Sequence, residues 1–362
     1  MLHEAELFRV RMPLVEPFRT ATGETATKEA LLVRVRGDAG DGWGEVAAFT
    51  TPSYAPDTVD TARLVLRDYL LPALLAHGTL PRVRGHGAAR AAVECALLDG
   101  RLRRDGVSLA AHLGAVRAHV DAGVAIGLCD DGARFEELLR SYVDAGYRRV
   151  KCKIEPGRDA AVLRAARRTV GDDLPLAADA NGTYTLADAP ALTGLDAFGL
   201  QCLEQPLAAD ALADHAALAA RMRTPTCLDE TVTSATVARD AITFGAAHVV
   251  SVKPARLGIA EARAVHDVCV AAGVPAVAGG MLETGIGRAV LVAVAALPGF
   301  TMTGDCSASD RYFGLDGDLT EPFVLEDGRL RVPDLPGLGV TVRHEQLERF
   351  TVARERIRAE DV

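Results

Sequence analysis

The sequence predicts an α/β protein in which a (β/α)-barrel follows a smaller α+β domain. The length of 362 residues exceeds that of one ordinary domain. From Val120 onward, short apolar runs alternate with helical patterns, which is typical of a (β/α)-barrel. Three acidic residues, Asp179, Glu204 and Asp229, end successive runs at equal intervals of 25 residues. A doubly wound open sheet is the alternative, but no GxGxxG follows an early strand.

The N-terminal part shows strands first and helices afterwards. β-Type patterning predicts strands over Leu7–Met12 and Ala30–Arg36, and the segment Pro17–Gly23 between them is too rich in turn formers for a strand. Helical patterns follow over Val59–Leu75 and Ala88–Arg103. Strands followed by helices indicate an α+β domain.

Eight strand-like runs are expected in the barrel. They begin near Val120, Arg149, Pro175, Phe198, Thr226, His248, Pro275 and Phe300. A further strand-like hairpin, Phe323–Leu330, is too β-like for a last barrel helix. The expected division is an α+β domain over residues 1–118, a barrel over 119–320, and a C-terminal segment over 321–362 that returns to the α+β domain.

Charge and hydropathy limit the expected partners. The chain has 40 basic and 49 acidic residues and a formal charge of −9, so neither nucleic acid nor an anionic membrane is expected as a partner. The apolar run Ala289–Leu297 is too short to span a bilayer, and no basic, apolar-cored leader opens the chain. Seven cysteines without a CxxC pair indicate buried free thiols in a reducing cytoplasm, and nine scattered histidines disfavour zinc.

The three equally spaced acids are candidate metal ligands. Each closes an apolar run, where barrel enzymes place their active sites. Adjacent carboxylates repel one another and need either protons or a cation. Their oxygens favour Mg²⁺, for which Mn²⁺ can substitute. A solvated strand end or a helix start is the alternative for any one of these acids taken alone.

Two lysines flank the acids at nearly the same interval. Lys153 lies 26 residues before the first acid and Lys253 lies 24 residues after the last. Alternation along a strand directs Lys151 to the same side as Lys153, although a surface salt bridge is the alternative for Lys151. Lys253 closes the sixth strand, opposite the second across the barrel. Lys153 and Lys253 could therefore reach one carbon from its two faces.

Two further polar residues stand beside the acids. Alternation places Asn181 on the same side as Asp179, as a ligand-orienting or substrate-binding amide. Glu230 follows Asp229 directly and should point the other way, as a hydrogen-bond acceptor behind the site. Its alternative is an acid at the start of a helix.

Together these residues resemble the enolase superfamily, muconate-lactonizing subgroup, over essentially the whole chain. The resemblance is carried by Lys151-x-Lys153, Asp179-x-Asn181, Glu204-Gln-Pro, Asp229-Glu230 and Lys253-Pro. The segments PFRTATG, GWGEV, GGMLETGIGR and GDCSASDRYF resemble o-succinylbenzoate synthases and N-succinylamino acid (N-acylamino acid) racemases.

The resemblance implies a capping α+β domain on a modified TIM barrel, (β/α)7β, with Mg²⁺ on the three acids. The metal would bind a substrate carboxylate and stabilise the enediolate that forms when the α-proton leaves. In the synthase reaction of menaquinone synthesis, Lys153 would remove this proton from the cyclohexadiene carboxylate precursor, and Lys253 would stabilise the intermediate. In racemisation the two lysines would act as base and acid on opposite faces. A homo-oligomer is also implied.

The resemblance places a pocket for a small carboxylate substrate between the capping domain and the barrel. The residues expected to line it are Phe18, Phe49, Tyr54, Gly280, Met281, Leu282 and Phe313. Departures from the family pattern, namely Ala125, Ala278 and a shorter loop after Lys253, concern substrate preference rather than the chemistry.

Three other functions remain as alternatives. Muconate cycloisomerase and dipeptide epimerase belong to the same superfamily. Dipeptide epimerases that resemble this fold carry Asp-x-Asp at the eighth strand, where this chain has Asp305-Cys306-Ser307. A non-catalytic ligand-binding barrel is the alternative outside the enzymes, although all five acid and lysine positions are filled.

Overall fold

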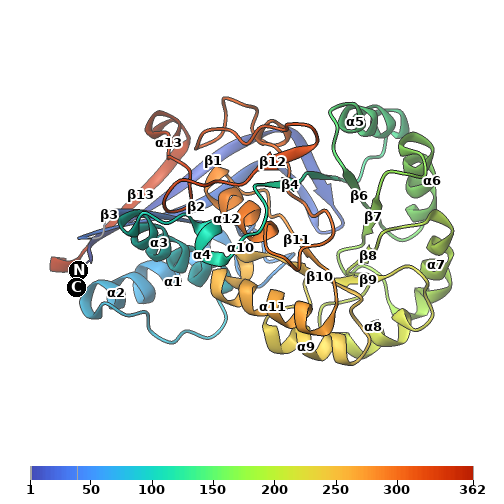
Figure 1. Ribbon diagram of the computed structural model, residues 1–362, viewed down its shortest axis with the longest axis horizontal. Coiled ribbons are helices and arrows are strands. Elements are labelled where there is room, and N and C mark those ends of the chain that lie inside the picture. Colours follow the sequence, from blue (N-terminus) through green and yellow to red (C-terminus); the bar gives the residue numbers. More distant parts are fainter. Residues whose placement is uncertain (1, 39, 362) are drawn as a thin grey trace.

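Two sheets organise the computed structural model, which describes residues 2–38 and 40–361. An antiparallel sheet has the strand order β13-β1-β2-β3, and a parallel sheet has the order β11-β10-β9-β8-β7-β6-β5. In Figure 1 the antiparallel strands lie toward one end of the molecule, and the parallel strands lie at the other end inside a curved row of helices. This architecture is the expected fold class, a modified barrel with an α+β capping domain.

The antiparallel sheet contains more strand than the sequence patterns predicted. Its strands are β1 (Leu2–Thr20), β2 (Gly23–Gly37), β3 (Gly40–Val46) and β13 (Thr351–Arg358). The predicted loop Pro17–Gly23 is confirmed only for the turn Ala21–Thr22. The residues on either side of that turn are strand, because Phe18 and Thr20 pair with Thr25 and Gly23 of β2. A register shift between Pro13 and Phe18 accommodates the prolines, which have no N–H for a regular ladder.

Alternate residues of the capping sheet enter two different cores. Leu31, Val33 and Val35 of β2 pack in a cluster with the helices that follow the sheet, whereas Ala30 and Leu32 belong to the large cluster that includes the barrel. Successive side chains of a strand point to opposite faces, so both faces of this sheet are buried. The covering helical elements are α1 (Val59–Val65), η1 (Leu66–Leu70), α2 (Leu71–His77) and α3 (Gly87–Asp105).

In the parallel sheet, at least one helix stands between every two successive strands. Its strands are β5 (Gly123–Ile126), β6 (Arg149–Lys153), β7 (Leu176–Asp179), β8 (Leu203–Glu204), β9 (Thr226–Leu228), β10 (Val249–Val252) and β11 (Ala276–Ala278). The helices after β5 to β11 are α5 (Gly132–Asp144), α6 (Asp159–Val170), α7 (Ala189–Gly194), α8 (Leu212–Ala219), α9 (Ala235–Thr243), α10 (Pro254–Leu257), α11 (Ile259–Ala272) and α12 (Gly285–Ala295).

The barrel differs from the prediction at its two ends. The run that begins near Val120 contains two strands. Its first part is β4 (His119–Asp121), which lies outside the parallel sheet, and its second part is β5, which carries Ala125 and is the predicted first strand of the barrel. The run near Phe300 has no strand among the described residues, although hydrogen bonds still place it between β11 and β5. Asp305 N donates to Ala278 O at one side, and Gly123 N donates to Cys306 O at the other. These isolated bonds are too few for a regular ladder.

Two C-terminal segments contact different parts of the molecule. The predicted hairpin Phe323–Leu330 is present in short form, as an antiparallel bridge between Glu326 and Arg329. The strand β12 (Arg329–Arg331) that follows its turn pairs with β4. The later strand β13 pairs with β1 of the capping sheet and follows α13 (His344–Phe350). The proposed limits of the three parts of the chain remain a prediction.

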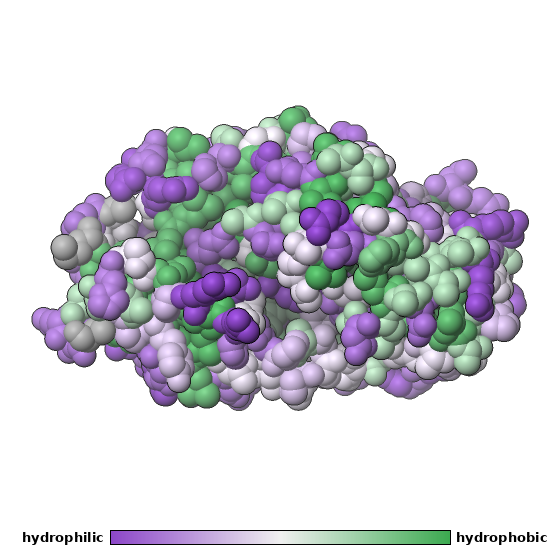
Figure 2. Space-filling model, turned by 90° about the horizontal axis from the view of Figure 1, so that it is seen from below, coloured by the Kyte–Doolittle hydropathy of each residue, from purple (hydrophilic) through white to green (hydrophobic). Residues whose placement is uncertain are grey.

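The outer surface and the cysteines add two observations. Hydrophilic and hydrophobic residues are intermixed on the face seen in Figure 2. None of the helices in the described part of the chain is long and apolar enough to cross a membrane. All seven cysteines lie within that part and are free thiols, as predicted, and six of them are buried.

We expect the contact between β3 and α3 to tolerate no side chain at Gly44. A Cβ atom at this residue would overlap the carbonyl oxygen of Ala92 in α3. Gly44→Ala should therefore lower the free energy of unfolding by about 1–3 kcal/mol, as overpacking of a core does. Denaturant titration measures this loss. The control is Gly132→Ala at the start of α5, where a Cβ meets nothing within 4 Å and stability should not fall. Equal effects of the two substitutions would contradict the prediction.

Candidate active site

The carboxyl ends of five parallel strands bring the predicted acids and lysines together. Lys153 and Asp179 are register partners at the ends of β6 and β7, and Asp179 is in turn the partner of Glu204 at the end of β8. Asp229 directly follows β9, and Lys253 directly follows β10. All five side chains are buried, with exposed fractions of at most 8%.

Each acid faces the ammonium group of a lysine. The contacts are Lys153 Nζ to Asp179 Oδ2 at 2.6 Å, Lys151 Nζ to Glu204 Oε2 at 2.9 Å, and Lys253 Nζ to Asp229 Oδ2 at 2.7 Å. Lys151 and Lys153 do point to the same side of β6, and Cys152 packs in the hydrophobic core. The surface salt bridge considered for Lys151 is excluded by its exposed fraction of 2%.

Asp305 and Arg149 complete the surroundings of Lys151. Asp305 accepts from Lys151 Nζ at 2.6 Å and from Arg149 Nη1 at 2.7 Å. Sequence reasoning missed Arg149, although it stands two residues before Lys151 and alternation alone would place it on the same side. Burial disfavours ionisation of Asp305, but the two cations outweigh it and lower the pKa of this carboxyl group.

Asn181 connects Lys153 with Glu230. Its Oδ1 accepts from Lys153 Nζ at 2.8 Å, and its Nδ2 donates to Glu230 Oε1 at 3.0 Å. Glu230 is thus the hydrogen-bond acceptor that the sequence led us to expect behind the site, and it reaches Asn181 from the turn after β9. Burial, together with Asp229 and Asp179, raises the pKa of Glu230 to about 8.

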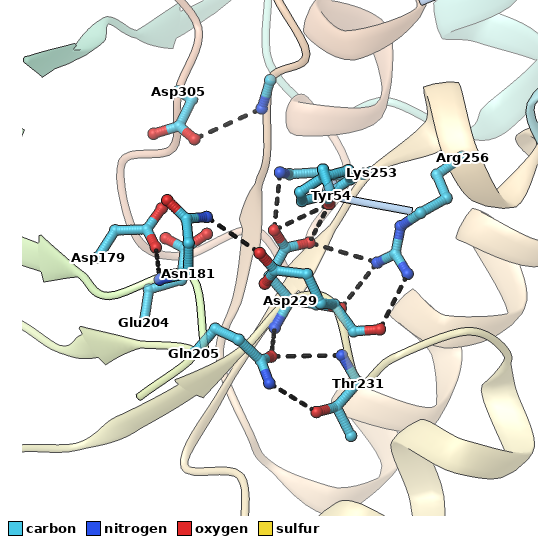
Figure 3. Close-up of polar contacts among 12 residues, drawn as sticks. Tyr54, Asp179, Asn181, Glu204, Gln205, Asp229, Thr231, Lys253, Arg256 and Asp305 are labelled. Atoms are coloured by element: carbon cyan, nitrogen blue, oxygen red, sulfur yellow. Dashed lines mark hydrogen bonds and ion pairs between the residues drawn. The ribbon is translucent and has the colours of Figure 1, made fainter. Parts of the chain in front are cut away.

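Tyr54 carries the capping domain into direct contact with the acids and lysines. Its hydroxyl group donates to Asp229 Oδ2 at 3.0 Å, and its ring lies 4.5 Å from Lys253 Nζ (Figure 3). Arg256 approaches Asp229 from another side and donates to its backbone oxygen at 2.7 Å. Burial disfavours the Lys253 ammonium group, but Asp229 outweighs it and raises the pKa of this lysine.

Gln205 holds the backbone on which Asp229 stands. Its Oε1 accepts from Asp229 N at 3.0 Å and from Thr231 N at 3.3 Å, and its Nε2 donates to Thr231 Oγ1 at 2.8 Å (Figure 3). Gln205 itself adopts a φ of 38°, which is uncommon for a residue with a side chain. Gln205 is part of the Glu204-Gln-Pro motif, but the spacing of that motif did not indicate what this residue does.

One cavity joins the two lysines to the capping domain. Its water-sized free space is about 50 Å³. Of the predicted pocket residues, it is lined by Phe18, Phe49, Tyr54, Gly280, Met281 and Leu282, together with Lys151, Lys153, Asn181 and Lys253. Phe313 does not line it and packs in the hydrophobic core, whereas its neighbour Tyr312 faces the cavity, because adjacent side chains diverge after the turn Ser309–Arg311.

The three acids have the oxygen ligands that a hard cation prefers, but their side chains do not form a preformed metal-binding site. No group of three or more His, Cys, Asp or Glu residues in the described ranges is arranged to hold a metal ion, since each acid turns an oxygen toward a lysine. Glu204 Oε1, however, is buried without a hydrogen-bond partner among the described residues. Burial opposes ionisation of Asp179, but Lys153 and Lys151 lower its pKa to about 2. Burial raises the pKa of Glu204, the acid with the unpartnered oxygen, and a divalent cation beside that oxygen would favour the ionised carboxylate that Mg²⁺ binds.

Comparisons with known proteins agree over the whole chain. Residues 3–114 match the N-terminal domain of the mandelate racemase / muconate lactonizing enzyme family, and residues 134–347 match the enolase C-terminal domain-like family. The chain is 49% identical to an N-succinylamino acid racemase of an Amycolatopsis species, covering 98% of each chain, and 42% identical to the o-succinylbenzoate synthase of Geobacillus stearothermophilus, covering 95% and 94%. A crystal structure of an enolase superfamily member from Listeria innocua has a TM-score of 0.92 at 34% identity and covers 99% of each chain.

We expect Gln205→Met to destabilise the fold, because it leaves the buried N–H groups of Asp229 and Thr231 without an acceptor. The free energy of unfolding should fall by about 2–6 kcal/mol, the sum of two such losses, as measured by denaturant titration. Gln201→Met is the matched control, since the buried Oε1 of Gln201 has no partner among the described residues, and it should cost less than about 1 kcal/mol. A loss no larger at Gln205 than at Gln201 would disprove this role.

Proposed function

The chain belongs to the mandelate racemase / muconate lactonizing enzyme family of the enolase superfamily, and from this premise we propose that it removes the proton α to a substrate carboxylate. The reaction is that of an o-succinylbenzoate synthase, an N-succinylamino acid racemase, or both. The observation that carries the proposal is that Lys153 and Lys253 line one cavity while each contacts a carboxylate on a different strand.

Lys153 acts as the base in this proposal, in the form of the neutral amine, with Asp179 bound to the metal ion instead of paired with this lysine. Its Nζ contacts Asp179 and Asn181, and these two contacts direct it toward the cavity. For synthesis, the α-proton passes to Lys153, the C–H electron pair forms the new ring double bond, and hydroxide leaves the neighbouring carbon. The released hydroxide and the proton together make water, and the product ring is aromatic. Lys253 remains an ammonium group that balances negative charge on the substrate.

Racemisation uses the same groups, but both lysines transfer protons. Lys153 takes the α-proton from one face, and Lys253 donates a proton to the other face. In the reverse direction the two lysines exchange roles. Tyr54 and Asp229 orient Lys253 as Asn181 and Asp179 orient Lys153, so both lysines have a hydrogen-bonding or ring partner besides a carboxylate.

Asp179, Glu204 and Asp229 would hold Mg²⁺, for which Mn²⁺ could substitute. The ion would supply positive charge beside the substrate carboxylate, which makes the α-proton more acidic. The unpartnered Oε1 of Glu204 supports this assignment. The free cysteines support a cytoplasmic location, and self-association remains a prediction from the family.

The contacts of Asp305 disfavour a dipeptide epimerase. Its two carboxylate oxygens already accept from Arg149 and Lys151. Ser307, where that enzyme type carries a second acid, donates its hydroxyl group to Gly123 O. Neither residue is therefore free to bind the α-amino group of a dipeptide.

The two lysines should differ in isotope exchange. In deuterated water with Mg²⁺ and either enantiomer of an N-succinyl amino acid, the wild-type protein should exchange the α-proton, as followed by proton NMR. Lys153→Ala should lower both exchange from its own face and synthase turnover by at least about 100-fold. Lys253→Arg should block exchange of one enantiomer while the other still exchanges. Equal, mild losses from both changes would refute the assigned roles, and no reaction of the wild type would refute the proposed function.

Metal binding should depend on the three acids. Calorimetry of the chelator-treated protein should detect one Mg²⁺ per chain, and Mn²⁺ should compete for the same site. Glu204→Gln should weaken binding by about 10-fold to 100-fold or more, because an ionised ligand is lost. Asp240→Asn, which changes an acid that is paired with Arg239 on the surface, should leave the affinity unchanged. Unaltered affinity in Glu204→Gln would exclude Glu204 as a ligand.

A further inference from the structure

The four lysines of this chain have an unusual distribution. The sequence contains 40 lysines and arginines, of which only Lys28, Lys151, Lys153 and Lys253 are lysines. All four are buried, with exposed fractions between 1% and 8%. Three of them form the site described above. The fourth, Lys28, lies far away in sequence, on β2 of the capping sheet. All the other residues in this count are arginines. A buried lysine in this chain therefore marks a place that suits a compact ammonium group.

Lys28 joins the capping domain to the barrel. Its Nζ donates to Ala47 O at 2.7 Å, to Ala48 O at 3.4 Å and to Met281 O at 3.2 Å. Ala47 and Ala48 follow β3 in the capping domain, whereas Met281 follows β11 in the barrel. An ammonium group has three donors, and here each donor has a carbonyl acceptor. The three bonds cross-link two segments that are distant in sequence.

A second link connects the same two segments. Glu45, at the end of β3, accepts from Thr284 N at 3.0 Å, from Thr284 Oγ1 at 2.7 Å and from Gly287 N at 2.9 Å. Burial lowers the pKa of Lys28 to about 8, while the nearby carboxyl groups of Glu45 and Glu283 act to raise it. The two acids thus oppose the effect of burial on this lysine.

Both segments that Lys28 holds form walls of the catalytic cavity. Phe49, the residue after Ala48, lies with its ring 5.1 Å from Lys28 Nζ and lines the cavity together with Met281. Phe49 also packs edge to face against the ring of Tyr54, with the ring centroids 6.0 Å apart, and Tyr54 contacts Asp229. Movement of the Lys28 contacts would therefore displace two walls of the cavity while the acids and lysines of the barrel stay in place.

We propose that Lys28 is a positioning residue that sets the distance between the Phe49 wall and the Met281 wall, and thereby selects the part of the substrate remote from the reacting carbon. This inference rests on the proposed function, because that function defines the substrate. The walls are apolar, so the part that they select is an apolar side chain or the methylene groups of the acyl chain. Lys28 does not touch the reacting atoms.

The test compares Lys28→Met with a control on the same strand. Methionine keeps the length of the side chain and removes all three donors. Glu29→Gln is the control, because Glu29 binds Arg9 and Arg11 on the capping sheet and does not line the cavity. Lys28→Met should raise the KM for N-succinyl amino acids by about tenfold or more and lower kcat by less than about threefold. Glu29→Gln should change both constants by less than about twofold, even where its Tm falls.

Hydrogen–deuterium exchange supplies a readout that does not depend on activity. Lys28→Met should speed exchange in residues 45–54 and 279–284, and Glu29→Gln should not. If methionine prevents folding, Lys28→Gln, which keeps an N–H donor, should show the same changes at smaller size. Lys28→Arg should not restore the KM, because a planar guanidinium needs more room than an ammonium group.

The outcomes separate this inference from the proposed function. An unchanged KM in Lys28→Met would overturn the role of Lys28 whatever the exchange data show. The same conclusion would follow if Lys28→Met and Glu29→Gln raised the KM and lowered the stability by equal amounts. If the wild-type protein catalyses neither reaction, the proposed function is wrong. In that case unchanged exchange in both segments would still overturn the inference, and faster exchange in both would support the positioning role.

Discussion

Every buried ammonium or guanidinium group at the carboxyl ends of these strands needs an acceptor within hydrogen-bond distance, and much of the structure follows from that need. An unpaired buried charge costs several kcal/mol, about 3–5 when one partner of a buried pair is removed. Lys153 and Lys253 each face an acid from a neighbouring strand, and Lys151 shares Glu204 and Asp305. The network therefore couples the order of the strands to the protonation of the groups that would do the chemistry.

The capping domain closes the cavity and also contributes side chains to this network. Tyr54 brings a hydroxyl group and an aromatic ring to Asp229 and Lys253, and Lys28 anchors the preceding segment. Glycines make the close packing possible. At Gly279 an added Cβ would collide with the side chain of Lys253, so the absence of a side chain there lets the lysine lie against the backbone. The geometry of the site thus depends on contacts made by both sheets.

The sequence was sufficient to predict the features that repeat along the chain. The interval between Asp179, Glu204 and Asp229 reflects one strand-plus-helix unit, and alternation predicted that Lys151 and Lys153 share a side. It could not reveal Tyr54 at Asp229 or the bonds from Gln205, because these join residues whose separation follows no period. It also failed for most of Pro17–Gly23 and near Phe300. In the first case pairing with a neighbouring strand overrode turn propensity, and in the second an apolar run entered the barrel without a regular ladder.

The confinement of lysine to four buried positions gives the molecule an unusual chemical surface. Reagents that acylate or cross-link side-chain amines find no lysine among the exposed residues. Any such reagent that enters the protein meets only amines at the capping contact and the catalytic cavity, so the loss of reactive amines would report on access to the interior. Attachment to a solid support would use carboxyl, guanidinium or thiol chemistry instead, the last at the partly exposed Cys129. The same feature would make Lys28 and the three lysines of the proposed active site the only lysine targets for covalent inactivation.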